Sequence, residues 1–101
     1  MSHVVLLWLK HKGDALERAR IIATAKTFPS QIPGILAMSV GETLPSERPI
    51  VDSSFDVGLV IRFENKEALA AYEKNPVHQK AVAEVLKPLA AKIVVHDWTV
   101  R

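Results

Sequence analysis

The sequence predicts an α+β fold in the ferredoxin-like order βαββαβ, with a four-stranded antiparallel sheet and helices on one face. One observation is the order of elements: four segments have the character of strands, and two segments with apolar residues at helical spacing separate them. The other observation concerns burial. Both faces of the predicted sheet carry apolar residues, and two helices can cover only one of them. We therefore expect the uncovered face to pack against a second copy, giving a homodimer through the sheet faces.

The first strand is expected from His3 to Lys10. Successive side chains of a strand point to opposite faces. One face therefore carries His3, Val5, Leu7 and Leu9, and the other carries Val4, Leu6 and Trp8. Because both faces are apolar, both must be covered.

A helix should follow, with Asp14 as its N-cap and Ala15 as its first residue. Pro29 limits this helix, because the residue before a proline disfavours helical geometry. The regular helix should therefore end near Thr27 or Phe28. Phe28 and Ile32 should then hold the connection against the core.

Pro33-Gly34 has the residues of a type II turn. A short strand is expected from Ile35 to Val40. Residues 42–54, which include Pro45 and Pro49, are expected to form a long loop. Loops of this length in a compact domain tend to be mobile or functional.

The third strand is the clearest in the chain. Its expected apolar face consists of Phe55, Val57, Leu59, Ile61 and Phe63. Asp56 lies opposite that face and is expected to pair with a cation or to cap a loop.

A kinked pair of helices comes next. Asn65 is a good N-cap, and Asn75-Pro76 stops the first helix and begins the second. Tyr72 and His78 flank this kink, six positions apart. Both rings are therefore expected at one cavity.

The chain closes with the rest of the second helix and a strand. The helix continues an apolar stripe through Val82, Val85, Leu86 and Leu89. Pro88 should end or bend it. The last strand is expected from Ile93 to Val100, with Ile93, Val95 and Asp97 on one face.

Composition narrows the functional classes. The 101 residues suit a single domain over 1–101, and the absence of cysteine removes disulfides, thiolate chemistry and cysteine metal sites. The formal charge is only +2, and the basic residues are scattered, so no nucleic-acid partner is expected.

The apolar run Val4 to Leu9 is too short to span a bilayer, and no secretory signal is evident, so no membrane partner and a cytoplasmic location are expected. His11 and His96 lack ligand spacing, and neither a metal nor another cofactor is expected.

Three elements together resemble a known family. They are His3-Val4-Val5, Phe55-Asp56 before the strand to Phe63, and Ala68-Leu69-x-x-Tyr72-x-x-Asn75-Pro76-x-His78. On them the chain resembles, over essentially its whole length, the stress-responsive A/B barrel domain (Dabb) proteins, which are dimeric α+β barrels of about this size. The last element is similar to the family pattern Leu-x-x-Tyr-x-x-His-Pro-x-His, with Asn75 where His is frequent.

The resemblance implies a site. A plant member is a polyketide cyclase that closes a linear poly-β-ketoacyl chain by aldol chemistry. Its catalytic acid/base pair matches Tyr72 and His78, and its first-strand histidine in the same cavity matches His3. A further cavity histidine of the cyclase aligns with Val57. Val57, Leu7 and Phe63 are the apolar residues expected at the substrate pocket.

Two functions remain open. In the first, the dimer is an enzyme that binds a small apolar or polyketide-like substrate in each subunit, with His78 as base and Tyr72 as acid. An imidazole with a pKa near ~6.5 can accept a proton from an acidic methylene, and a phenol can donate to the developing oxyanion. In the alternative, the dimer is a non-catalytic stress-related or ligand-binding protein. His78 is then only a first-turn helix residue, and Tyr72 is a core aromatic.

Overall fold

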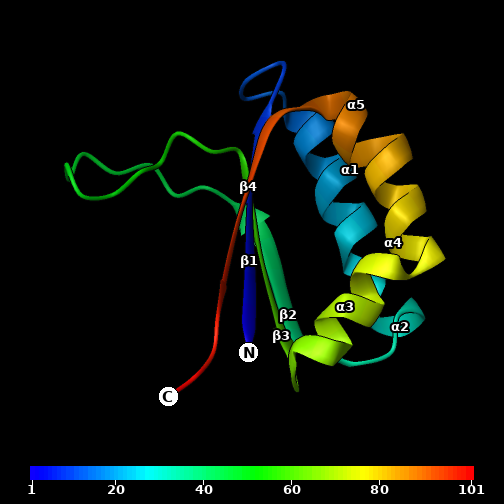
Figure 1. Cartoon of the computed structure of the whole chain (residues 1–101). Coiled ribbons are helices and arrows are strands. Elements are labelled where there is room, and N and C mark those ends of the chain that lie inside the picture. Colours follow the sequence, from blue (N-terminus) through cyan, green and yellow to red (C-terminus); the bar gives the residue numbers. More distant parts are fainter.

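A single antiparallel sheet with all helices on one side makes up the computed structural model, which describes all 101 residues (Figure 1). The elements are β1 (Ser2–Leu9), α1 (Ala15–Lys26), α2 (Phe28–Gln31), β2 (Ile35–Glu42), β3 (Val57–Phe63), α3 (Lys66–Lys74), α4 (Pro76–Ala81), the π-helical turn η1 (Val82–Leu86), α5 (Lys87–Leu89) and β4 (Ala90–Trp98). The strand order is β2-β3-β1-β4, and every neighbouring pair is antiparallel. The predicted α+β, ferredoxin-like arrangement is confirmed.

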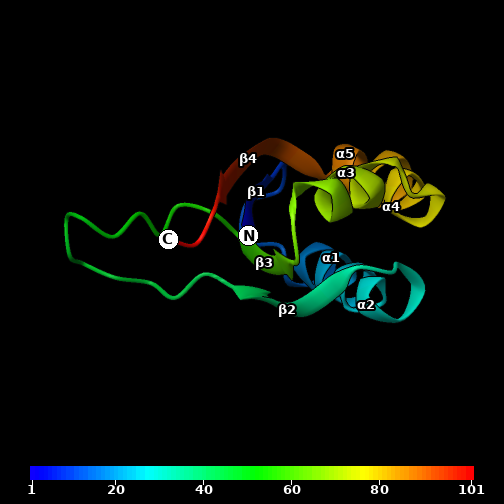
Figure 2. The same ribbon diagram turned by 60° about the horizontal axis from the view of Figure 1, so that its bottom comes forward.

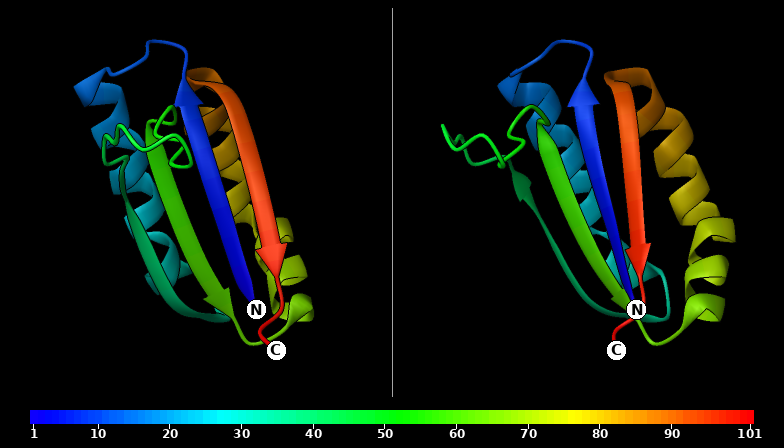
Figure 3. Two further views of the ribbon diagram at one scale, coloured as in Figure 1. Left: turned by 90° about the vertical axis from the view of Figure 1, so that its left-hand side faces the viewer. Right: turned by 60° about the vertical axis from the view of Figure 1, so that its left-hand side comes forward.

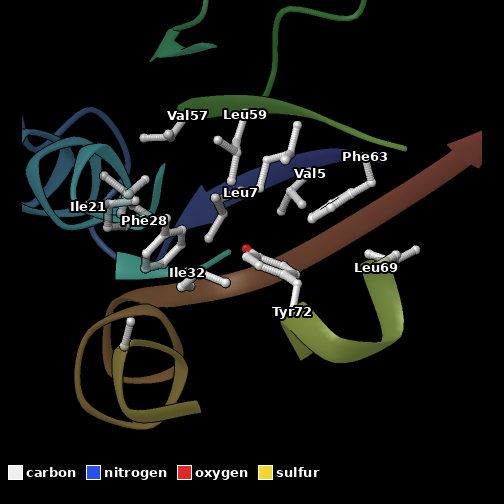
Figure 4. Packing of buried hydrophobic residues seen from close by; sticks show 14 residues of the cluster. Val5, Leu7, Ile21, Phe28, Ile32, Val57, Leu59, Phe63, Leu69 and Tyr72 are labelled. Atoms are coloured by element: carbon white, nitrogen blue, oxygen red, sulfur yellow. The ribbon is translucent and has the colours of Figure 1, made fainter. Parts of the chain in front are cut away.

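Strand β1 lies inside the sheet, between β3 and β4 (Figure 3). The predicted alternation is confirmed: His3, Val5, Leu7 and Leu9 are buried under the helices, and Val4, Leu6 and Trp8 are half-buried on the outer face. The buried apolar residues of β1 and β3 meet those of α1, α2 and α3 in one core cluster (Figure 4).

The helix boundaries follow the predicted caps. The Asp14 carboxylate accepts a hydrogen bond from the Glu17 backbone N–H at 2.9 Å and begins α1. Helix α1 ends at Lys26, and Phe28 and Ile32 bury the connection, as predicted. Gly34 has a φ of 93°, which suits the turn predicted at Pro33-Gly34.

The predicted kink between α3 and α4 is also confirmed. Asn65 caps α3 by accepting from the Ala68 backbone N–H at 2.9 Å. Asn75 ends α3 and caps α4 by accepting from the Val77 backbone N–H at 2.9 Å. The break lets residues on two short helices face the same side of the sheet.

Pro88 does not end the second helix at once. The chain widens into the π-helical turn, in which the Lys87 backbone N–H bonds to the Val82 carbonyl, and α5 then continues to Leu89. A proline lacks the N–H for a regular helical bond, and its ring crowds the preceding turn. A wider turn before Pro88 accommodates both defects.

The prediction that Phe55 shares a face with Val57 is wrong. Strand β3 begins only at Val57, after a bend at Asp56. Phe55 packs on the outer face, with its ring 6.4 Å from that of Trp8, and it lies against Gly58. The bend reverses the expected alternation, so Asp56 is buried instead of Phe55.

The buried Asp56 carboxylate joins β3 to the end of β1. Its Oδ2 accepts from the Leu9 backbone N–H and its Oδ1 from the Gly13 backbone N–H, both at 2.9 Å. The Asp56 backbone N–H donates to the Leu7 carbonyl at 2.8 Å. Asp56 therefore caps the loop that leads from β1 into α1, one of the two roles expected for it.

Strand β2 is longer than predicted, since it continues to Glu42. Residues 43–55, here called the β2–β3 arm, have no regular structure and project from the side of the sheet that carries no helices (Figure 2). None of the helices has the length and hydropathy needed to cross a bilayer.

Replacing Asp56 by alanine is expected to lower the free energy of unfolding by about 3 kcal/mol, because two backbone N–H groups lose a charged acceptor. Asp56→Asn keeps one oxygen as an acceptor, so its free energy of unfolding should fall by about half as much. The measurement is urea unfolding at one protein concentration.

The matched control for this change is Asp52→Ala, because the Asp52 carboxylate bonds only to Ser54 in the exposed arm. Stability of the control should equal that of the wild type. Equal stabilities of Asp56→Ala and Asp52→Ala would contradict the structural role of Asp56.

Candidate functional site

A cavity of about 200 Å³ lies between the sheet and the helices. Its wall is mainly apolar, and its apolar residues come from all four strands and from α1, α2 and η1. Four residues with polar groups also line it: His3, Tyr72, Glu73 and His78. A dry cavity of about 150 Å³ is large enough for benzene, so this one has room for a single ring with a small substituent.

The cavity brings together most of the residues expected at the site. His3, Leu7, Val57, Tyr72 and His78 all line it. Phe63 does not. Its ring packs 5.1 Å from that of Tyr72 and belongs to the solid core beside the cavity.

Tyr72 is the most enclosed of the polar residues, with an exposed fraction of 1%. It projects from α3 into the apolar cluster, and its hydroxyl points inward (Figure 4). Burial raises the pKa of the phenol above its usual range, and the neighbouring Glu73 charge adds to the shift. The hydroxyl therefore stays protonated at neutral pH and can donate a hydrogen bond.

His78 lies in the first turn of α4, with its ring 4.2 Å from that of Tyr72. Burial lowers the pKa of this imidazole, an effect that the backbone of Glu73 only partly opposes. Its Nδ1 is buried and has no hydrogen-bond partner in the chain. A neutral imidazole with an unpaired ring nitrogen is equipped to bind a polar group or to exchange a proton.

His3 enters the cavity from β1 and is held by a carboxylate. Strands β1 and β4 pair His3 with Asp97, and His3 Nδ1 lies 2.6 Å from Asp97 Oδ1. Because a carboxylate only accepts, the proton of the neutral ring belongs on Nδ1, which leaves Nε2 as the acceptor. The ring lies edge-on to Tyr72, 5.9 Å away.

Asp97 is the residue of this site whose role the sequence did not reveal. It was expected on the same strand face as Ile93 and Val95, and an acid on an otherwise apolar face was the available signal. The pairing itself depends on the register between the first and last strands, which sequence alternation does not determine.

The histidine side chains do not assemble a metal site. No group of three His, Cys, Asp or Glu side chains in the chain is placed to hold a metal ion. His11 instead pairs with Glu17 on the surface, at 2.9 Å. Tyr72, His78 and His3 place hydrogen-bonding groups at the wall of the cavity.

A second hollow, of about 270 Å³, is lined by residues of α3, α4, η1 and α5. It shares Glu73, His78 and Val82 with the cavity. His78 thus borders both the inner cavity and this more open hollow.

Comparison with known proteins gives one family. The family model described as Stress responsive A/B Barrel Domain matches residues 1–100. A stress-response A/B barrel domain-containing protein of Arabidopsis thaliana is 29% identical over 98 residues, which are 97% of this chain. The chain spans only 36% of the length of that relative.

Solved structures agree with this fold. A Dabb family protein with a ferredoxin-like fold from Mesorhizobium loti has a TM-score of 0.79 at 26% identity, covering 99% of this chain and 95% of its own. The hydroxynitrile lyase of Passiflora edulis has a TM-score of 0.82 at 19% identity, covering 99% and 92%. A dimeric ferredoxin-like protein of unknown function from Thermobifida fusca has a TM-score of 0.79 at 19% identity, covering 98% and 89%. At 19% identity the last two likenesses show a shared fold alone.

The lowered pKa of His78 predicts a pH dependence of stability. Between the folded pKa and the unfolded value of about 6.5, the unfolded chain binds a proton that the folded chain does not. The free energy of unfolding should therefore fall as the pH drops through about 6.5, and it should fall less steeply in His78→Gln. Urea unfolding at several pH values measures the slopes, and a proton NMR titration should place the His78 midpoint below about 6.5. A midpoint above that value, or identical slopes, would refute this description of the imidazole.

Proposed function

The chain belongs to the stress responsive A/B barrel domain family, and from this premise we propose that it is a homodimer that binds a small, mainly apolar molecule in each subunit and transfers a proton on it. In this proposal His78 is the base and Tyr72 is the acid. Its main support is the contact of the two rings at the wall of the cavity, where burial keeps the phenol protonated and the imidazole neutral.

The proposed chemistry uses these two states directly. The His78 imidazole takes a proton from a carbon next to a carbonyl group, and the Tyr72 hydroxyl donates to the oxyanion that develops there. His3, oriented by Asp97, offers Nε2 to a hydroxyl group of the ligand. The apolar wall excludes water, which strengthens these interactions.

The cavity limits the size of the ligand. Its volume of about 200 Å³ is below the range of roughly 300–1,000 Å³ that is usual for small-molecule pockets. A single six-membered ring with a small polar substituent suits this volume better than an extended polyketide chain. The hydroxynitrile lyase of Passiflora edulis supports the idea that this fold can carry catalysis.

The small volume also favours the second candidate, a non-catalytic stress-related or ligand-binding dimer. The name of the Arabidopsis relative refers to a stress response, and the chain spans only 36% of that relative. In this version Tyr72 and His78 bind a ligand or stabilise the core without transferring a proton. Binding and proton transfer must therefore be measured separately.

The dimer part of the proposal comes from the outer face of the sheet. All helices lie on the other side, and the outer face carries Val4, Leu6, Trp8, Val60 and Trp98. Trp98 is 52% exposed and Val60 is 37% exposed in the single subunit. Exposed apolar residues gathered on one sheet face are typical of an interface. The relative from Thermobifida fusca is described as dimeric, which agrees with this proposal.

Cyclohexanone in D₂O tests proton transfer without knowledge of the natural substrate, because NMR follows deuterium exchange at the carbons beside its carbonyl group. The wild-type protein should accelerate this exchange. His78→Gln should lower the protein-dependent rate by about 100-fold or more, and Tyr72→Phe should also lower it. His11→Gln changes an exposed histidine far from the cavity and is the matched control.

Binding is measured on the same variants by thermal shift with phenol and p-cresol. Stabilisation of the wild type without exchange would favour the ligand-binding dimer over the enzyme. If the wild type shows no stabilisation by these compounds and no accelerated exchange, the proposal is overturned. An equal loss of folded protein in His78→Gln would identify His78 as a structural residue.

A further inference from the structure

The β2–β3 arm carries apolar side chains that contact little of their own subunit. Leu44 is 84% exposed and Ile50 is 82% exposed, although both are large and apolar. The arm leaves the sheet on the helix-free side and extends well beyond it (Figures 1 and 2). The arm thus presents two large apolar side chains to whatever lies on the helix-free side of the sheet.

The base of the arm is anchored beside the outer face of the sheet. The Trp8 indole N–H donates to Ser54 Oγ at 3.0 Å, and the Lys12 ammonium donates to the Ser54 carbonyl at 3.0 Å. Phe55 packs on Trp8 from the same side. The arm is therefore continuous with the apolar outer face rather than an unrelated loop.

Beyond its base the arm bonds only to itself. The Val51 backbone N–H donates to the Arg48 carbonyl at 3.0 Å, and the Arg48 backbone N–H donates to Ser46 Oγ at 3.2 Å. Pro49 lies within this turn and Pro45 precedes it, and both restrict the backbone. Proline reduces the freedom that an extended segment loses when it becomes ordered, so such a segment is well suited to pack on a partner.

The arm is long enough to pass the sheet of a second copy. About 13 residues that run out and back at about 3.3 Å per residue reach roughly 20 Å. Two sheets packed face to face lie about 10 Å apart. An arm of this reach therefore extends past the sheet of a second copy that packs on the outer face.

We propose that the β2–β3 arm of each subunit clasps the second copy of the chain, burying Leu44 and Ile50 against it. This inference rests on the homodimer of the proposed function, and it adds a specific part of the chain to the interface. A dimer with twofold symmetry contains two equivalent clasps, because each subunit gives one arm and receives the other. Four apolar side chains per dimer then leave water in addition to those on the sheet faces.

The test is sedimentation equilibrium over a range of concentrations for the wild type, Leu44→Ser/Ile50→Ser and the control Leu16→Ser. Leu16 is also 84% exposed but lies on α1, in the helical layer. The double variant should raise the dimer dissociation constant by about 100-fold or more, because each dimer loses four buried apolar side chains. The control should match the wild type, and circular dichroism should be the same for all three proteins.

A second measurement uses the absence of cysteine from the chain. A polarity-sensitive dye on Ile50→Cys should shift its emission to the blue as the dimer forms, whereas the same dye on Leu16→Cys should not shift. A wild-type dimer with an unchanged dissociation constant in the double variant would overturn the clasp and leave the dimer intact. A wild-type protein that stays monomeric at every concentration would overturn both the clasp and the proposed dimer.

Discussion

The structure depends on one strand that is apolar on both faces. Strand β1 pairs with β3 on one side and β4 on the other, so it cannot move to an edge without losing hydrogen bonds. Its inward apolar residues belong to the core under the helices, and Val4, Leu6 and Trp8 point away from every helix. The helical layer therefore covers one face of the sheet, and we propose that a second copy of the chain covers the other face. The β2–β3 arm projects from this uncovered side, and we propose that it contacts the same second copy.

The site follows from two local breaks in regular structure. Asn75 and Pro76 divide one helix into two, which brings the Tyr72 and His78 rings to 4.2 Å. The π-helical turn before Pro88 places Val82 and Leu86 at the cavity wall. Tyr72 and His78 thus lie on two short helices whose boundary is set by the first of these breaks. The opposite wall of the cavity comes from the regular strands, where Asp97 on β4 holds His3 on β1.

The parts predicted from sequence are those that local chemistry determines. Asp14, Asn65 and Asn75 cap helices within three residues of themselves, and strand alternation placed the residues of β1 correctly. Phe55 was misplaced because Asp56 turns inward to bond Leu9 and Gly13, which are more than 40 residues away in the chain. The His3–Asp97 pair was likewise missed, since it depends on the register between the first and last strands. Phe63 lies on the strand face that was predicted to line the pocket. Strand alternation identifies this face, but it does not determine which of its residues border the cavity.

The proposed site requires a cavity that remains open beneath Tyr72 and His78. Xenon is an apolar probe that enters such cavities without requiring a known ligand. A crystal structure under xenon pressure is the most direct measurement. We expect xenon in contact with Tyr72, His78 and Leu7 between the sheet and the helices. A core in which side chains fill this space and no xenon binds would contradict the proposed site.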